Sequence, residues 1–304
     1  MARNIGASVY EKLRNVSREK GIDMQSLLRL YAQQRLLYRI SVSECAPQFC
    51  LKGGIMLAAH NGGDMVRPTD DMDFNGFGEG GIAEVEAALR SAATAAVPED
   101  GVRFEVGSMK VLKDREGNIP GGKVVLDGFV HTARVRVRVD VGFGNVITPG
   151  AHPMEIPTLL PDVVPRPVIA GYPLETIVSE KLHAIAQFGD DNTRHKDYYD
   201  IWRIAQGYEI DGGTLCSAVV NTFAQQGRVA ATAMPGLSDR FAMENVRAWT
   251  AFTRKTGLKD APDMTEAILD LRAFLVPAIT GACSDSRWMP GEGWSVPVQA
   301  LSMR

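Results

Sequence analysis

The alternating stretch at residues 133–141, Ala-Arg-Val-Arg-Val-Arg-Val-Asp-Val, constrains the fold more than any other part of the sequence. Successive side chains of a strand point to opposite faces, so the four valines lie on one face and the arginines and Asp140 on the other. The valine face is expected to pack against helices. The pattern therefore predicts a strand in a helix-covered sheet, with Asp140 on its polar face.

Similar patterns elsewhere predict an α+β fold. Strands are expected at 104–112 and 123–129, around a turn at 114–118. The spacing Ser8-x-x-Glu11 is typical of a capping box at the start of a first helix. Helices are predicted at 8–20, 23–40, 82–96, 174–187, 196–206, 215–226, 238–256 and 264–279.

The predicted organisation has N-terminal helices at 1–44, a mixed-sheet core at 45–150, and a linker with a helical C-terminal domain at 151–304. The main boundary is a proline-rich stretch from 149 to 173 with little periodicity. The tail after Gly281 contains Trp288 and Trp294 among glycines and prolines, and it is predicted to be irregular.

Composition limits the possible classes of protein. A net charge of −3 argues against a surface made for indiscriminate nucleic-acid binding, so any RNA contact must be a local patch. The four cysteines have no C-x-x-C spacing, which favours reduced thiols in a cytoplasmic protein over a zinc ribbon or disulfide framework. No apolar run approaches the roughly 18 residues of a membrane span, and no signal peptide is evident.

Two carboxylates in the stretch from Leu51 to Phe74 are candidates for a metal site. Asp71 and Asp73 are two residues apart, so on a strand both project from the same face. Mg²⁺ that carries nucleotide phosphates is usually held by one or two protein carboxylates, and a paired-metal site stabilises attacking and leaving oxygens. The alternative is an acidic turn.

Asp140 is expected on a strand next to, or near, the one that carries this pair. It could instead form an exposed ion pair with Arg138. We favour the metal site, because three carboxylates on one sheet face would repel one another without cations.

Lys181 falls within the apolar stripe of the helix predicted at 174–187. A lysine on a buried stripe is unfavourable unless it has a partner or a wet pocket. We therefore expect Lys181 to line a cleft and contact the β- or γ-phosphate of a nucleotide, and a methionine there to leave the melting temperature unchanged or raised. The alternative is a snorkelling lysine. The sequence has neither a G-x-S-x-G element nor a P-loop motif.

The residues Phe49-Cys-Leu-Lys-Gly-Gly-Ile-Met-Leu57 and Arg67-Pro-Thr-Asp-Asp-Met-Asp-Phe74 together form a longer motif. It resembles the first motif of the DNA polymerase β-type nucleotidyltransferases, and in full that of the AbiEii/AbiGii family of toxin nucleotidyltransferases. The segments 179–184 and 194–202 are similar to two further segments of that family.

The resemblance implies a polymerase β-like nucleotidyltransferase core that transfers a nucleoside monophosphate from an NTP to a hydroxyl. Asp71 and Asp73 would hold Mg²⁺ or Mn²⁺. Asp140 would coordinate one of these ions and help deprotonate the acceptor. Lys181 would neutralise phosphate charge, and Asp197 would orient Lys181 or the acceptor.

Other residues of the motif would contact the nucleotide. The backbone of Gly53 and Gly54 would cradle phosphate at a helix N-terminus. Many relatives have Gly-Ser at these positions, so here a missing hydroxyl contact would come from backbone N–H groups or Thr69. Arg67 would neutralise charge or anchor the strand. Asp200 would support the fold, or form a surface ion pair with Lys196.

By resemblance, the biological role is the toxin of a bacterial type IV toxin–antitoxin or phage abortive-infection pair, with a DNA-binding repressor as antitoxin. Some relatives add nucleotides to tRNA 3′ ends. The arginines at 134, 136 and 138 could form a local basic strip for such an RNA acceptor. The alternatives are an adenylyltransferase that modifies an antibiotic, and a non-catalytic RNA- or protein-binding module on the same fold.

Overall fold

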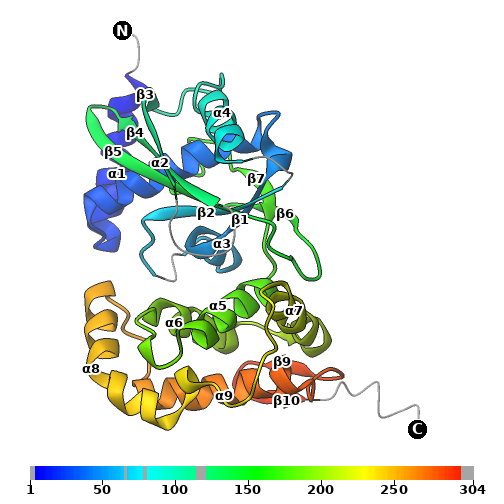
Figure 1. The fold of residues 1–304 in the computed structure, drawn as a ribbon. Coiled ribbons are helices and arrows are strands. Elements are labelled where there is room, and N and C mark those ends of the chain that lie inside the picture. The colour runs from blue at the N-terminus through cyan, green and yellow to red at the C-terminus, as the bar shows by residue number, and fades with distance from the viewer. Residues whose placement is uncertain (1–3, 65–66, 78–80, 114–120, 296–304) are drawn as a thin grey trace, which may run out of the picture. The chain divides into compact units, whose positions relative to one another are not determined.

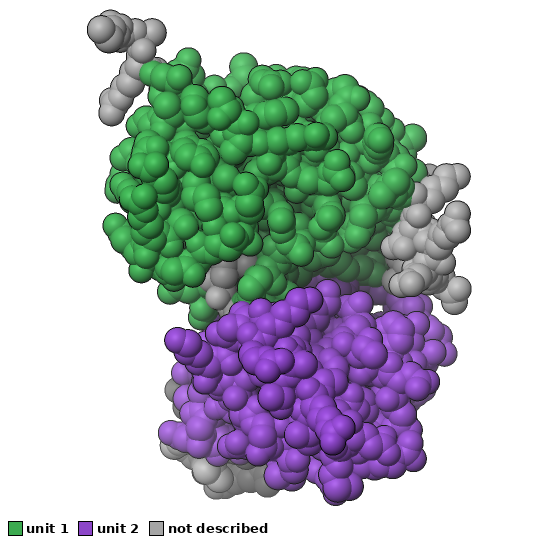
Figure 2. Space-filling view, turned by 90° about the vertical axis from the view of Figure 1, so that its left-hand side faces the viewer, with its two compact units in different colours: residues 1–145, 152–171 green, residues 146–151, 172–304 purple. Residues whose placement is uncertain are grey.

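The computed structural model describes residues 4–64, 67–77, 81–113 and 121–295. The chain divides into two compact units, which Figure 2 shows in different colours. The first contains Met1–Asn145 and His152–Gly171, and the second contains Val146–Ala151 and Tyr172–Arg304. The N-terminal helices thus belong to the same unit as the sheet. The turn predicted at 114–118 lies outside the described residues.

The first unit contains a seven-stranded mixed sheet in the order β3-β4-β5-β2-β1-β7-β6 (Figure 1). Neighbouring strands are antiparallel except β2 with β5 and β1 with β7, which are parallel. The three strands predicted from alternation are all present. The strands are β1 Phe49–Lys52, β2 Asp71–Gly76, β3 Val102–Lys113, β4 Gly121–Val130, β5 Ala133–Phe143, β6 His152–Glu155 and β7 Val168–Gly171.

Helix α2 is the centre of the first unit, because it packs against β4, β5 and the neighbouring helices. The four valines of β5 are buried, which confirms the predicted apolar face. Asp23 is the N-cap of α2, near the predicted start of that helix. Helix α1 begins before the predicted capping box, because the Asn4 side chain accepts a hydrogen bond from Ala7 N–H. The helices are α1 Ile5–Lys20, α2 Met24–Ser41, η1 Ala46–Gln48, α3 Gly53–His60 and α4 Ile82–Ala93.

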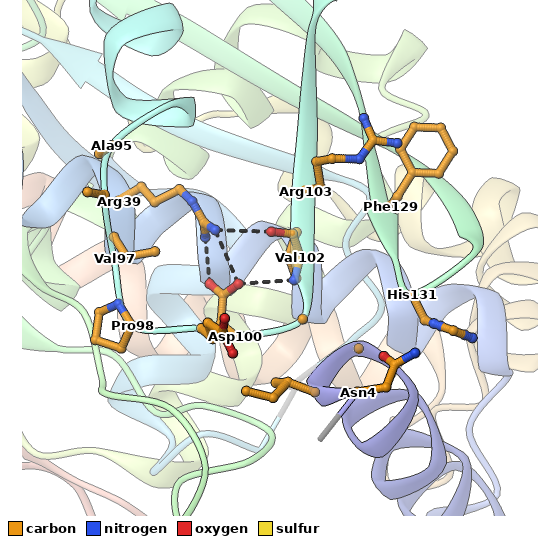
Figure 3. Close-up of a pocket in the computed structure, with 15 residues that line it drawn as sticks. Asn4, Arg39, Ala95, Val97, Pro98, Asp100, Val102, Arg103, Phe129 and His131 are labelled. Carbon is orange, nitrogen blue, oxygen red and sulfur yellow. Dashed lines mark hydrogen bonds and ion pairs between the residues drawn. The ribbon is translucent and has the colours of Figure 1, made fainter. Parts of the chain in front are cut away.

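A buried ion cluster ties α2 to the start of β3 (Figure 3). Asp100 accepts from Arg35 Nε at 3.0 Å and from Arg39 Nη1 at 2.6 Å, and Arg39 Nη2 donates to the Val102 carbonyl at 3.2 Å. Arg39 and Asp100 also line a pocket of about 580 Å³. Both terminal nitrogens of Arg39 are directed at protein acceptors, so this arginine presents fixed, compensated charge to the pocket.

The proline-rich stretch predicted as a linker contributes two strands of the sheet, β6 and β7. Strand β7 pairs in parallel with β1, and β6 is the outer strand beyond it. An edge strand tolerates proline because the missing N–H faces no partner, and Pro153 lies on β6. Sequence periodicity could not show these strands, because each has only four residues.

The second unit is helical, as predicted, with Gly257 as the left-handed C-cap of α8. Up to residue 295, however, the tail is not irregular, because β9 and β10 form a hairpin that pairs with β8. Trp294 stacks on Phe274 with ring centroids 5.7 Å apart, and Trp288 contacts the same ring at 4.9 Å. The elements are α5 Leu174–Phe188, η2 Gly189–Asp191, α6 His195–Gly207, β8 Ile210–Asp211, α7 Gly212–Gln225, η3 Pro235–Leu237, α8 Asp239–Thr256, α9 Met264–Thr280, β9 Arg287–Met289 and β10 Gly293–Ser295.

The four cysteines are all free thiols. Cys216 and Cys283 are neighbours, with their sulfurs 3.5 Å apart. No helix among the described residues has both the length and the apolar character needed to cross a membrane.

Candidate active site

Three predicted site residues meet on one face of the sheet in the first unit. Strand β2 runs parallel to β5, and their register places Asp73 beside Asp140 and Asp71 beside Arg138. Paired residues on adjacent strands point to the same face. The register therefore brings Asp71, Asp73 and Asp140 together, and it confirms that Asp140 lies on the strand next to the Asp71–Asp73 strand.

Two lysines that the sequence reasoning missed extend this row. Lys123 of β4 is the register partner of Asp140, and Lys52 of β1 is the register partner of Asp73. The row across β4, β5, β2 and β1 is therefore lysine, aspartate, aspartate, lysine. Lys52 directly precedes Gly53 and could have been suspected, whereas the place of Lys123 depends on a strand register that periodicity does not supply.

The Lys123 ammonium lies between two of the carboxylates. Its Nζ is 3.1 Å from Asp140 Oδ2 and 3.7 Å from Asp71 Oδ2. The second oxygen of each, Oδ1, is buried without a hydrogen-bond partner. Among the described residues, no three histidine, cysteine, aspartate or glutamate side chains are already gathered as a metal site. Asp71 and Asp140 thus share one face and one lysine, and the Oδ1 atom of each could still coordinate a cation.

Burial and the close approach of these aspartates and lysines shift the pKa values of Asp140 and Lys123. Burial raises the pKa of Asp140 to about 6, and the charges of Asp71 and Asp73 add to this effect, although Lys123 opposes it. Burial lowers the pKa of Lys123, but the hydrogen bond and charge of Asp140, with the charge of Asp71, more than offset this and leave it raised. Lys123 therefore stays protonated beside the carboxylates.

The two glycines of the motif fit closely around this row. Gly53 has φ +70, and a Cβ there would lie 2.0 Å from Asp73 Oδ2. A Cβ on Gly54 would lie 2.9 Å from Oγ1 of Thr69. The Asp73 carboxylate thus lies against the N-terminus of α3, where the helix dipole favours negative charge. Only glycine at position 53 allows this approach.

The loop before β2 is held by α2. Gln33 Nε2 donates to the Asp70 carbonyl at 2.8 Å, and the Arg29 guanidinium contacts the Asp70 carboxylate. Arg67 is buried and donates to the Pro68 carbonyl at 3.2 Å, while Thr69 Oγ1 donates to the Asp71 carbonyl at 3.3 Å. These contacts fix where β2 begins.

The arginines of β5 are exposed but partly neutralised. Arg134 and Arg136 both pair with Asp127 of β4, at 2.5 and 3.5 Å, and Arg138 Nη1 is 3.9 Å from Asp71 Oδ1. From the sequence, Asp140 was considered as the ion-pair partner of Arg138. In the structure, Arg138 pairs with Asp71 instead. The three arginines therefore share this face, and two carboxylates, Asp127 and Asp71, compensate part of their charge.

The remaining predicted site residues form a cluster in the second unit. Lys181 Nζ on α5 is 2.9 Å from Asp197 Oδ1 and 2.7 Å from Asp200 Oδ2 on α6. Arg194 Nε donates to Asp197 Oδ2 at 2.7 Å. Both aspartate side chains are 1% exposed and Lys181 is 12% exposed, so Asp200 is a core residue. The expected contact between Asp197 and Lys181 is present.

The charges of this cluster stabilise one another. Burial alone would raise the pKa of Asp197, but Lys181 and Arg194 outweigh burial and lower it to about 2 from its ordinary 3.8. A depressed folded-state pKa adds stability above the unfolded-state value. Asp197 therefore stabilises the fold by about 2 kcal/mol above pH 4, and this contribution is lost as the pH falls toward 2.

We predict that Gly53→Ala destabilises the protein far more than Gly62→Ala. Gly62 has nearly the same backbone angle, φ +68, but nothing lies within 4 Å of its added Cβ. Both substitutions carry the strain of a left-handed residue, about 1 kcal/mol. Only Gly53→Ala also forces the Asp73 carboxylate aside, which adds about 1–3 kcal/mol. Urea unfolding measures the difference, and equal losses would contradict the packing of Asp73 on Gly53.

We also predict that Lys181→Met destabilises the protein by about 3–5 kcal/mol at neutral pH, because two buried carboxylates lose their shared cation. This reverses the stability effect expected from the sequence. The loss should shrink as the pH falls toward 2, because Asp197 then begins to be protonated in the wild-type protein as well. Unfolding at several pH values tests this, with the exposed Lys255→Met as control. An unchanged melting temperature in Lys181→Met would contradict it.

Comparison with known proteins agrees with this architecture. The fold resembles that of JHP933 from Helicobacter pylori, with a TM-score of 0.50, 13% identity, and coverage of 85% of this chain and 94% of that chain. A second H. pylori structure, described as a candidate nucleotidyltransferase, has a TM-score of 0.48 and 13% identity, and the match covers 85% of this chain and 96% of that chain. No match is found among curated proteins.

The sequence itself places the chain in a family. Residues 35–274 match the profile described as nucleotidyl transferase AbiEii toxin, type IV TA system. The matched region contains Asp71, Asp73 and Asp140 on the sheet, and also the cluster of Lys181 with its two aspartates. The chain therefore belongs to the AbiEii family of nucleotidyltransferase toxins of type IV toxin–antitoxin systems.

Proposed function

We propose that this nucleotidyltransferase moves a nucleoside monophosphate from an NTP to a hydroxyl at an RNA 3′ end, with divalent cations held by Asp71, Asp73 and Asp140. The observation that carries the proposal is the register of β2 and β5, which aligns these carboxylates on one face. Asp71 and Asp140 each keep a buried oxygen without a hydrogen-bond partner. Such an oxygen donor set suits Mg²⁺ or Mn²⁺.

A bound cation would supply charge stabilisation for the attacking and leaving oxygens. The side chains of the chain do the positioning. Asp73 is held against Gly53 at the start of α3, and the same helix N-terminus suits a phosphate group. Asp140 lies beside Asp73 in the strand register, a place that suits a carboxylate that helps hold a cation and takes the proton of the acceptor hydroxyl.

The cluster in the second unit supports the nucleotide assignment in a different way. Lys181 is a compact cation that two buried carboxylates hold in a fixed place. A preorganised ammonium of this kind can neutralise phosphate charge without ordering a flexible side chain first. We assign Lys181 to the triphosphate of the NTP and Asp197 to its orientation.

The acceptor is assigned from the exposed arginines of β5. Arg134, Arg136 and Arg138 lie on the same sheet face as the carboxylates and are 61%, 58% and 42% exposed. An RNA backbone would bind this strip through its phosphates. A cationic antibiotic would be repelled, so this observation favours RNA over the small-molecule alternative.

Within its family, the chain would act as a toxin by modifying RNA, and a tRNA 3′ end is the acceptor we propose. Its activity would inhibit growth or abort a phage infection until an antitoxin relieves it. The antitoxin would be a DNA-binding repressor encoded nearby. The intact carboxylates and Lys181 argue against a non-catalytic binding module.

We predict that Asp71→Asn and Asp73→Asn abolish nucleotide transfer and relieve growth inhibition while the protein stays folded. The reason is that each substitution removes a metal-binding charge. Transfer of each labelled NTP to total cellular RNA measures the effect, and the exposed Asp162→Asn serves as control. Full transfer by the wild-type protein in excess EDTA would contradict the metal dependence.

A double substitution of Arg134 and Arg136 by glutamine should weaken RNA modification and flatten its salt dependence, because each phosphate contact contributes about one unit of slope. NTP binding should persist. The Asp127 carboxylate already compensates part of this charge, so we expect a slope change of about one rather than two. Arg14→Gln with Arg18→Gln on α1 makes the same charge change elsewhere. Wild-type RNA modification by the β5 variant at every salt concentration would exclude this strip as the RNA contact.

A further inference from the structure

Lys123 occupies a position that its sequence context does not explain. Its ammonium bridges carboxylates from two strands, Asp140 at 3.1 Å and Asp71 at 3.7 Å, while its own strand, β4, lies on the far side of β5. An ordinary cross-strand ion pair would join Lys123 to its register partner Asp140 alone. The lysine instead reaches across β5 to a second strand.

This ammonium satisfies the carboxylates incompletely. It contacts Oδ2 of each aspartate, and Oδ1 of each remains buried and without a hydrogen-bond partner. Leaving a buried acceptor unsatisfied is unfavourable. A divalent cation, with more charge and more coordination positions than an ammonium, could be shared by the same two carboxylates more fully.

The lysine is also free to leave, in contrast to Lys181. The Lys123 side chain is 35% exposed, and its partners are 32% and 34% exposed. Lys181 is 12% exposed, and its partners are 1% exposed. A lysine head group on a flexible four-carbon stem can move into water without moving its strand. Lys123 is thus a displaceable cation, and Lys181 is a fixed one.

We propose that Lys123 is an internal counter-ion that occupies the divalent-cation position between Asp71 and Asp140 and competes with the metal for it. This inference rests on the proposed metal site. Lys123 stabilises the metal-free protein by reducing repulsion among the carboxylates, and it weakens the binding of metal alone. A metal–nucleotide complex brings phosphates that give the displaced ammonium a new anionic partner, so it displaces Lys123 more readily than metal alone.

The test measures Mn²⁺ binding without nucleotide, by the electron paramagnetic resonance signal of the free ion, and melting temperature with and without Mn²⁺. The variants are Lys123→Met, which removes the charge, and Lys123→Arg, which keeps it. Lys110→Met removes a similar charge from an exposed position on β3 and serves as the matched control.

We expect Lys123→Met to bind Mn²⁺ about tenfold more tightly than wild type, because one adjacent positive charge and one competing ion pair are gone. Without metal it should melt a few degrees below wild type, and saturating Mn²⁺ should close that gap. Lys123→Arg and Lys110→Met should bind Mn²⁺ as wild type does. A merely structural lysine would lower the melting temperature by the same amount with and without Mn²⁺.

The outcomes separate this inference from the proposed metal site. If Mn²⁺ binds wild type and Lys123→Met with equal affinity, the counter-ion role is overturned and the metal site stands. If Lys123→Met does not fold, Lys123→Arg decides, and a tenfold gain in its Mn²⁺ affinity would also overturn the role. If Mn²⁺ binds none of the proteins at millimolar concentration, the metal site itself fails, and this inference fails with it.

Discussion

The parallel register between β2 and β5 is the constraint on which the acidic site depends. A shift of one residue would move Asp140 to the apolar face and its neighbouring valines to the polar face, because side chains alternate along a strand. Burial of the valines against α2 therefore fixes where Asp140 points. The same burial energy that builds the core holds three like charges together on the opposite face.

That arrangement is unfavourable without cations, and the sheet contains its own. Lysines stand at both ends of the row, on β4 and β1, and Arg138 lies beside Asp71. Gly53 has no Cβ, so the Asp73 carboxylate can lie against the start of α3, where the helix dipole favours its negative charge. Charge on this face is thus balanced by several weak and partly exposed contacts, an arrangement that a ligand can replace.

Much of this could be predicted from the sequence, for physical reasons. Alternation over nine residues identified β5, and the two-residue spacing of Asp71 and Asp73 placed both on one face. Helical spacing located Lys181 on a buried stripe. The contact of Lys181 with Asp197 was expected only from the family resemblance. Its second partner, Asp200, and the partners of Lys123 were not predicted, because they depend on helix packing and on strand register. The short strands β6 to β10 were missed because two to four residues carry no usable period.

The two charged clusters differ in a way that bears on their roles. In the second unit, both oxygens of Asp197 have cationic partners, and the pair is almost fully buried. Removing a member leaves a buried charge uncompensated, so this cluster stabilises the fold and keeps the Lys181 ammonium in place. In the first unit, Asp71 and Asp140 are about one-third exposed, and each keeps a buried oxygen without a hydrogen-bond partner. A site that must bind and release a cation needs carboxylates whose charge is only partly compensated, since carboxylates that were fully paired within the protein would gain nothing from binding it.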